Sequence, residues 1–225
     1  MTLIVVAEGH GETEAIRNIV MRLRDSDDLG LPFIPRQGGV QRKDIRSRGR
    51  LEDACTIAAN RGATALLLTR DADNEEHVDE LGDCPKVRAP ETAAWVRQLH
   101  LPFPAAVVMF RWEYESMFLA GLGTIAGQPI VGDDQITRPG ILASAAFHGD
   151  PDQGPRGAKE WLTQNMPPGV AYKPSTDQLA FTRMLELEDK RLNALPSFKR
   201  LRRALQFLSD HAGHAGAVYP QDGWS

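Results

Sequence analysis

The chain has 225 residues, enough for one substantial domain with a small appendage, and the composition of an ordinary globular protein. Hydrophobic residues make up 42% and charged residues 25%, and the formal net charge of -4 neither requires nor excludes a nucleic-acid partner. No apolar run approaches the roughly 20 residues that span a bilayer, and no basic region precedes the first apolar segment as in a signal peptide. We therefore expect a cytoplasmic protein with no membrane partner. The two cysteines give neither a metal-ligand pattern nor a disulfide framework.

The first elements in the chain are a buried strand and an amphipathic helix. A continuous apolar run predicts the strand at 3–7, and apolar residues at helical spacing predict the helix at 15–23. A short strand is expected at 31–35, where two prolines favour a sheet edge or a strand end. The basic, glycine-containing segment 38–50 is expected to be a loop.

The same alternation continues through the next segments. A helix is predicted at 51–61 and a second buried strand at 63–69, which leads directly into Arg-Asp-Ala-Asp. A helix at 91–100 and a third buried strand at 104–110 follow. Strands that alternate with helices predict an α/β fold with a mainly parallel sheet flanked by helices.

The character of the chain changes after residue 127, where proline, glycine and aspartate become frequent. Helices are predicted at 157–165 and 197–208. We therefore expect a catalytic core over 1–127 and a C-terminal extension, helical or irregular, that packs on this core over 128–210. The glycine-rich segment 211–225 is expected to be a flexible tail.

Each of the three buried strands is followed by acidic residues. Glu8 follows the first strand, Asp71 and Asp73 follow the second, and Glu113 and Glu115 follow the third. The carboxyl ends of parallel strands meet along one edge of an open sheet, where ligands bind. Carboxylates gathered there raise one another's pKa unless a cation neutralises them, and Mg²⁺ or Mn²⁺ suits such oxygen ligands. In an extended segment Asp71 and Asp73 point to the same side, so both are candidates for one metal site.

The structural alternative is that these acids are helix caps or first-turn residues, which complement the helix dipole. We expect that role for Glu14, and a solvated surface for Glu76 and Asp79. Acids at three separate strand ends, with Asp-x-Asp at the middle one, are a more specific pattern than any one of them alone.

The segments AEGHGE (7–12) and RDAD (70–73) resemble the motifs of the TOPRIM domain. This domain occurs in topoisomerases, bacterial primases, a ribosomal-RNA maturation nuclease and nucleases of the overcoming-lysogenization-defect type. In it, a glutamate after the first strand and an Asp-x-Asp after a later strand hold one or two divalent metals. The resemblance implies a TOPRIM-like version of the α/β fold.

The chain is more similar still to a bacterial TOPRIM-like family catalogued only as a domain of unknown function. The similarity extends to ESMFLAG (115–121), YKPSTDQ (172–178) and PSFKRLRRAL (196–205), and it covers the chain up to about Leu208. Met117 departs from the pattern, since the family often has tryptophan there. The metal ligands that the resemblance implies are Glu8, Glu12, Asp71, Asp73 and Glu115.

A nuclease of this kind would use its metals to lower the pKa of a water and to stabilise the leaving oxygen. Related nucleases also use a lysine near the scissile phosphate, for which Lys173 is the first choice here and Lys159 the second. Either lysine is alternatively an ordinary exposed residue. The catalytic residues implied are therefore Glu8, Asp71, Asp73 and Lys173.

Basic residues are concentrated in the predicted loop before the second helix. Such a stretch can contact a phosphate backbone with salt-dependent affinity, or it can be an ordinary solvated surface. The candidate nucleic-acid-binding residues are Arg42, Lys43, Arg46, Arg48 and Arg50.

The leading functional prediction is a Mg²⁺-dependent phosphodiesterase that acts on DNA or RNA. Members of the resembled family are often encoded beside ABC-type or AAA-type ATPases, which implies an effector of a bacterial defence module with such an ATPase partner. One alternative is a non-catalytic TOPRIM-fold module that binds an ATPase or nucleic acid. Another is a phosphotransfer enzyme that acts on a small substrate.

Overall fold

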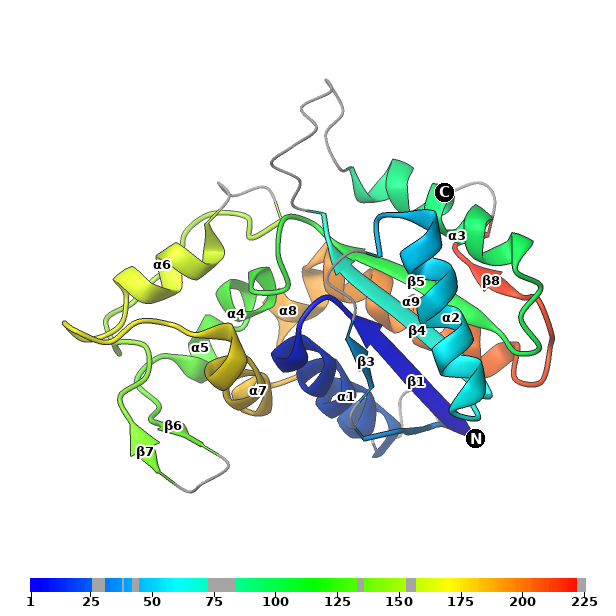
Figure 1. Ribbon diagram of the computed structural model, residues 1–225. Helices are drawn as coiled ribbons and strands as arrows, with labels where there is room; N and C mark the ends of the chain where they lie inside the picture. Colours follow the sequence, from blue (N-terminus) through cyan, green and yellow to red (C-terminus); the bar gives the residue numbers. More distant parts are fainter. Residues whose placement is uncertain are drawn as a thin grey trace.

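The computed structural model describes residues 1–25, 31–37, 39–41, 45–72, 84–132, 136–152 and 157–221, without the side chains of His10 and Gln41. Its centre is a parallel sheet with helices on both faces (Figure 1). The strand order is β2 (Ile34–Pro35), β1 (Thr2–Ala7), β4 (Ala65–Asp71), β5 (Ala105–Phe110) and β8 (Val218–Tyr219), and β3 (Val40–Gln41) also pairs with β1. Every pairing in this sheet is parallel, which confirms the predicted α/β class.

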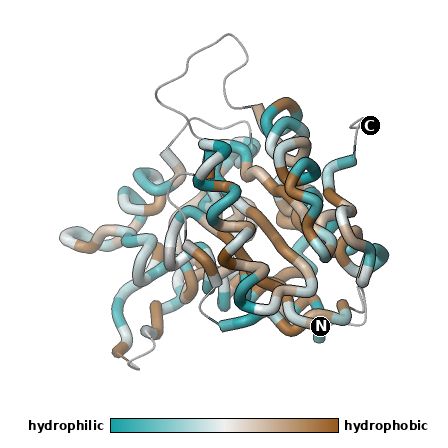
Figure 2. The backbone as a smooth tube through the Cα atoms, turned by 45° about the vertical axis from the view of Figure 1, so that its right-hand side comes forward, coloured by the Kyte–Doolittle hydropathy of each residue, from teal (hydrophilic) through white to brown (hydrophobic). Residues whose placement is uncertain are grey.

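The three central strands are apolar along their length because both faces of the sheet are covered. In β1, Val5 lies opposite Leu67 of β4, and Leu68 of β4 lies opposite Val107 of β5. Successive side chains point to opposite faces, so Val5 and Leu67 belong to one core and Leu68 and Val107 to the other. Figure 2 shows the hydrophobic strands enclosed between helices whose outer sides are more polar.

Four helices form the two layers. The helices α2 (Arg48–Asn60) and α3 (Pro85–Gln98) cover one face, and α1 (His10–Asp25) and α9 (Pro196–Asp210) cover the other. The predicted helices at 51–61 and 91–100 therefore exist but begin earlier in the chain. Among the described residues, no helix has both the length and the apolar character needed to cross a membrane.

The remaining elements lie beside the α1 layer. They are α4 (Ser116–Ala120), α5 (Leu122–Ile125), α6 (Ala158–Gln164), α7 (Pro174–Met184), α8 (Lys190–Ala194) and a hairpin of β6 (Ile130–Val131) and β7 (Thr137–Arg138). Helix α7 packs along α1, and an aromatic cluster of Phe118, Tyr172 and Phe181 fixes it there. The helix prediction for 157–165 matches α6, whereas no helix was predicted at α7.

The C-terminal region is more closely integrated than the predicted division at residue 127 suggests. Helix α9 packs directly on β4 and β5, and its apolar side shares one core with α1. The prediction of a flexible tail is wrong for residues 211–221. In this segment β8 (Val218–Tyr219) pairs with β5, and the ring of Tyr219 packs on Phe207. Gly213 and Gly216 adopt positive φ, so these glycines turn the chain back to the sheet.

The N-terminal end of α9 is held by Asp152, a carboxylate from the segment before α6. Its Oδ2 accepts a hydrogen bond from the main-chain amide of Ser197 at 2.9 Å, and its Oδ1 accepts one from the Ser197 hydroxyl at 2.9 Å. The guanidinium of Arg200 lies 3.8 Å from Oδ2. Asp152 is only 2% exposed, so these bonds form in a buried setting next to the positive end of the helix dipole.

We expect Asp152→Ala to lower the free energy of unfolding by about 2–4 kcal/mol, because it removes the acceptors of a buried amide and a buried hydroxyl. Urea denaturation measures this difference. The matched control is Asp150→Ala, which removes an exposed carboxylate with one bond to the Asp152 amide. Its expected cost is below about 1 kcal/mol. Equal costs for the two variants would contradict the assigned role of Asp152.

Candidate functional site at the carboxyl edge of the sheet

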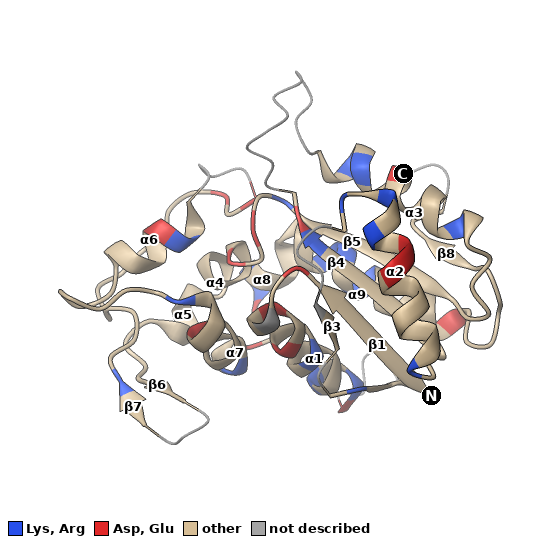
Figure 3. Cartoon of the chain, in the orientation of Figure 1, with Lys and Arg blue, Asp and Glu red and all other residues tan. Residues whose placement is uncertain are grey.

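The strands β1, β4 and β5 run in the same direction, so their carboxyl ends share one edge of the sheet. At this edge β1 turns into α1 through Gly9, whose carbonyl accepts hydrogen bonds from the amide and the hydroxyl of Thr13. Acidic residues gather around the same edge, as Figure 3 shows. The edge predicted from the sequence is thus formed by residues far apart in the chain.

Glu12 and Asp71 lie on adjacent elements at this edge, and both carboxylates are held by hydrogen bonds. Glu12 is in the first turn of α1 and is 5% exposed, and its Oε1 accepts a bond of 3.1 Å from the Thr69 hydroxyl. Asp71 ends β4, and its Oδ1 accepts a bond of 2.8 Å from the main-chain amide of Tyr114. Strand β4 and helix α1 therefore present their carboxylates in fixed orientations.

Glu115 is the most deeply buried acid of the group, with 0% of its surface exposed. Its Oε1 accepts a bond of 3.0 Å from the Tyr172 hydroxyl and a longer one of 3.5 Å from the Gln178 amide. Both partners belong to the segment at the start of α7, so this helix supports a carboxylate that follows β5.

Lys159, at the start of α6, places an ammonium among these acids. Its ammonium lies 3.1 Å from Glu113 Oε1, 3.6 Å from Glu115 Oε2 and 3.7 Å from Asp71 Oδ2. The main-chain amide of Lys159 also donates to Glu113, at 3.4 Å, which fixes the start of α6 against the edge. Burial lowers the pKa of Lys159, but the carboxylates of Glu115, Asp71 and Glu113 raise it by more.

The buried carboxylates destabilise one another's charged forms. Burial raises the pKa of Glu12 to about 8, and repulsion from Glu8 and Glu115 contributes. Burial also raises the pKa of Asp71, with Glu12 as the next cause, and raises the pKa of Glu115, although Lys159 opposes this effect. A cluster with these properties binds either protons or a cation.

Glu8 stands at the end of β1 beside basic residues. Burial raises the pKa of Glu8, whereas Arg46, Arg70 and the main-chain amide of Asp71 lower it. The guanidinium of Arg46 is 3.7 Å from Glu8 Oε1. Within the described residues, the buried oxygens Glu8 Oε1 and Glu115 Oε2 have no partner at hydrogen-bond distance, and their ion pairs with Arg46 and Lys159 are longer, at 3.7 and 3.6 Å. Buried acceptors that make no hydrogen bond are uncommon, and a bound ion is one of the ways in which they are satisfied.

The carboxylate oxygens of this edge are the ligands that a hard divalent cation prefers, and two of them make no hydrogen bond within the described residues. Their present positions are not those of a formed metal site. In the described part of the chain, no group of three or more His, Cys, Asp or Glu side chains is arranged to hold a metal ion. The ammonium of Lys159 instead stands among Asp71, Glu113 and Glu115.

The structure brings together most of the predicted acids, but of the two predicted lysines only Lys159 lies among them. Glu8, Glu12, Asp71 and Glu115 lie at the common edge, and Asp73 is outside the described residues. Lys159, the second choice, contacts the acids. Lys173, the first choice, is exposed and lines a neighbouring cavity.

The predicted basic loop is described only in part. Arg46 is near Glu8, while Arg48 and Arg50 begin α2, where Arg48 pairs with Glu52 at 2.9 Å. Arg42 and Lys43 lie outside the described residues.

Several supporting residues were not identified from the sequence. Glu113 was noted only as an acid after the third strand, and Thr69 was not considered. Tyr172 and Gln178 lie in the YKPSTDQ segment of the resemblance, but nothing in the sequence shows that they bond to Glu115.

Compared with protein-family models, with curated proteins and with solved structures, the chain gives no match. The function therefore has to be inferred from the chemistry of the site itself.

The raised pKa of Glu12 has a consequence for stability that can be measured. Its pKa rises from 4.5 to about 8 on folding, so the folded chain holds this proton more tightly than the unfolded chain. The resulting stabilisation is complete below the unfolded pKa and is lost as the pH rises towards the folded pKa.

We therefore expect the free energy of unfolding in metal-free buffer to contain a component that falls between about pH 5 and pH 8. Glu12→Gln cannot ionise and still accepts the Thr69 bond, so it should flatten this fall. It should also be more stable than the wild type at pH 8, by a few kcal/mol at most. Urea denaturation in EDTA across this range measures the slope, with Glu91→Gln on an exposed part of α3 as the matched control. Parallel pH profiles for the wild type and Glu12→Gln would contradict the expectation.

Proposed function

We propose that this chain is a TOPRIM-type phosphodiesterase that hydrolyses nucleic acid with Mg²⁺ or Mn²⁺ as its cofactor. The observation that carries the proposal is the meeting of buried carboxylates from three strand ends and the first turn of α1. Two of their oxygens, Glu8 Oε1 and Glu115 Oε2, make no hydrogen bond within the described residues and have only longer ion pairs with Arg46 and Lys159. A divalent cation would relieve the repulsion that raises the pKa values of Glu12, Asp71 and Glu115.

The residues that would hold the metal are Glu8, Glu12, Asp71 and Glu115, together with Asp73. A metal bound there would supply an activated water and would stabilise the charge on the leaving oxygen. The surrounding residues orient the ligands, because Thr69, the Tyr114 amide and the Tyr172 hydroxyl each fix one carboxylate oxygen. Such supporting bonds are a regular part of functional metal sites.

Lys159 has two roles in this proposal. Its ammonium partly neutralises Asp71, Glu113 and Glu115 without metal, and it would pair with the scissile phosphate when substrate enters the edge. Its side chain is 35% exposed, so an entering anion has access to it.

The nucleic acid would approach from the side of Arg46, which lies beside Glu8 near the start of α2. Arg42, Lys43, Arg48 and Arg50 belong to the same proposed contact region. A cytoplasmic location, a defence role and an ABC-type or AAA-type ATPase partner are further parts of this proposal, and they rest on the sequence resemblance.

Metal binding can be tested without any substrate. A cation that binds only the folded state stabilises it by about 2.7 kcal/mol at one hundred times its dissociation constant. We therefore expect the melting temperature to rise with Mn²⁺ or Mg²⁺ concentration. Asp71→Asn, which keeps an acceptor for the Tyr114 amide, should lose most of this rise, whereas Glu91→Gln should keep it. The absence of any shift with either metal in the wild type would remove the cofactor from the proposal.

Catalysis is tested with labelled single-stranded and double-stranded DNA and RNA in the presence of Mg²⁺ or Mn²⁺. Glu8→Gln should lower the cleavage rate by at least about a hundredfold, since even residues that only support metal ligands are worth roughly 10–100-fold. Glu91→Gln, which changes an exposed glutamate on α3, is the control for the same chemical change. Cleavage by Glu8→Gln at the wild-type rate would show that the activity arises elsewhere.

A further inference from the structure

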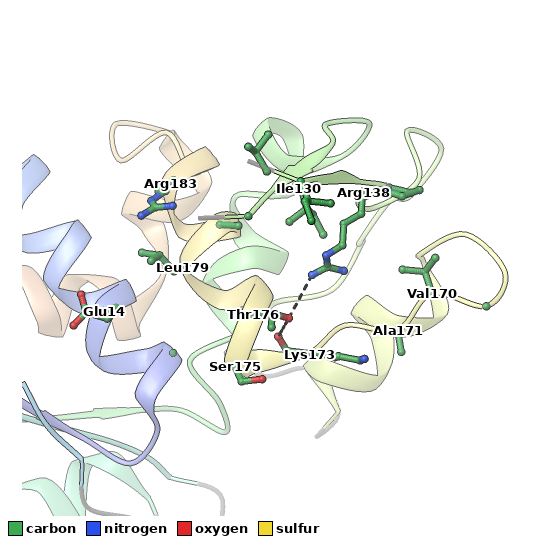
Figure 4. A pocket seen from close by; sticks show the side chains of 17 residues that line it. Glu14, Ile130, Arg138, Val170, Ala171, Lys173, Ser175, Thr176, Leu179 and Arg183 are labelled. Carbon is green, nitrogen blue, oxygen red and sulfur yellow. Dashed lines mark hydrogen bonds between the residues drawn. The ribbon is translucent and has the colours of Figure 1, made fainter. Parts of the chain in front are cut away.

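A cavity of about 750 Å³ lies beside the acid edge, between α7 and the β6–β7 hairpin (Figure 4). Ile130 and Arg138 line it from the hairpin, Thr176 and Leu179 from α7, and Val170 from the segment before α7. Its volume falls within the roughly 300–1,000 Å³ of typical small-ligand sites. Within the described part of the chain, none of the residues that the proposed function assigns to the metal, the scissile phosphate or the nucleic acid lines this cavity.

The cavity is adjacent to the acid cluster through Gly11, which lies between Glu8 and Glu12 in the sequence and also lines the cavity wall. A Cβ atom at Gly11 would come within 2.4 Å of the Pro174 carbonyl oxygen, so the start of α1 is in tight contact with the start of α7. The same stretch of chain therefore borders the acids on one side and the cavity on the other.

Helix α7 and the residues before it make the same connection. Tyr172 bonds to Glu115, and the next residue, Lys173, lines the cavity. Gln178 also reaches Glu115, and the next residue, Leu179, lines the cavity. Each residue that bonds to Glu115 is thus followed in the chain by a residue of the cavity lining. A ligand that extends from the acid edge along these residues reaches the cavity.

The lining combines positive charge with apolar surface. Lys173 and Arg183 are exposed cations of the lining, and Arg138 is held in place by the buried carboxylate of Asp177 and by Thr176, as Figure 4 shows in part. The apolar part of the wall is formed by Ile130, Val170 and Leu179. This combination suits a ligand with phosphate groups and flat, weakly polar rings, which is the chemistry of a nucleotide.

We propose that the cavity holds nucleotides of a single-stranded segment of the substrate, next to the phosphate that lies at the acid edge. The inference rests on the proposed function and specifies its substrate as single-stranded nucleic acid. The bases pack on the apolar wall, and the backbone phosphates pair with Lys173 and Arg183. The volume of about 750 Å³ is that of a small-ligand site, which suits one or two unpaired nucleotides rather than a base-paired duplex.

The test measures binding of a fluorescein-labelled single-stranded oligonucleotide by fluorescence anisotropy in EDTA, so that no cleavage occurs. Lys173→Glu removes one proposed phosphate contact, and Ala171→Glu adds a repulsive charge to the lining at an exposed position. We expect at least about a tenfold loss of affinity in each variant. Lys173→Glu should also reduce the slope of log affinity against log salt by about 0.7.

The matched controls are Lys199→Glu on α9 and Ala194→Glu on α8, which make the same chemical changes at exposed positions outside the cavity lining. Their affinity for the oligonucleotide should equal that of the wild type. Thermal melting of all four variants verifies that each one is folded, which is expected because all four positions are exposed.

Wild-type affinity in both Lys173→Glu and Ala171→Glu would overturn the inference. So would tighter binding of a duplex than of the single strand, or full competition by a free mononucleotide at equal concentration. These failures differ from a failure of the proposed function. If the wild type cleaves and Glu8→Gln does not, the proposed function stands even when the cavity variants bind normally. If the wild type cleaves nothing with either metal, the proposed function fails whatever the binding result.

Discussion

The structure depends on one electrostatic constraint, which is that several carboxylates share a buried edge where they repel one another. Glu12 and Glu115 have almost no exposed surface, so water cannot screen this repulsion as it does at a protein surface. The described chain compensates with the ammonium of Lys159 and with hydrogen bonds that each serve one carboxylate oxygen. The compensation is incomplete, since Glu8 Oε1 and Glu115 Oε2 make no hydrogen bond within the described residues and their ion pairs with Arg46 and Lys159 are longer, at 3.7 and 3.6 Å. This remaining imbalance is the physical basis for proposing a metal.

The second half of the chain is organised around the same constraint. Helix α6 brings Lys159 to the edge, the residues at and before the start of α7 bring the partners of Glu115, and α9 packs on β4 and β5. A core that ended at residue 127 would contain the acids, but it would lack Lys159 and the two residues that donate to Glu115, Tyr172 and Gln178. Helix α7 also forms a wall of the cavity. The position of this one helix therefore determines both the hydrogen bond to Glu115 and the shape of the cavity.

The errors of the sequence predictions have physical causes that can be traced to particular segments. Helix α7 was missed because it opens with Pro-Ser-Thr-Asp, a composition typical of turns, although proline is also favoured in the first turn of a helix. The segment 211–221 was expected to be flexible because it is rich in glycine, yet those glycines make turns that return the chain to the sheet. For the lysines, sequence similarity alone selected Lys173 first, and only the packing of α6 shows that Lys159 contacts the acids.

The sequence by itself determined the parallel α/β core and the acids at its edge, since long apolar runs specify strands buried on both faces and parallel strands end on the same side. Only the tertiary structure decided that Lys159 stands among Asp71, Glu113 and Glu115, that Tyr172 and Gln178 hold Glu115, and that a cavity lies alongside. These features join residues more than forty positions apart in the chain. Such contacts follow from how helices pack against one another, and no local pattern of residues encodes them.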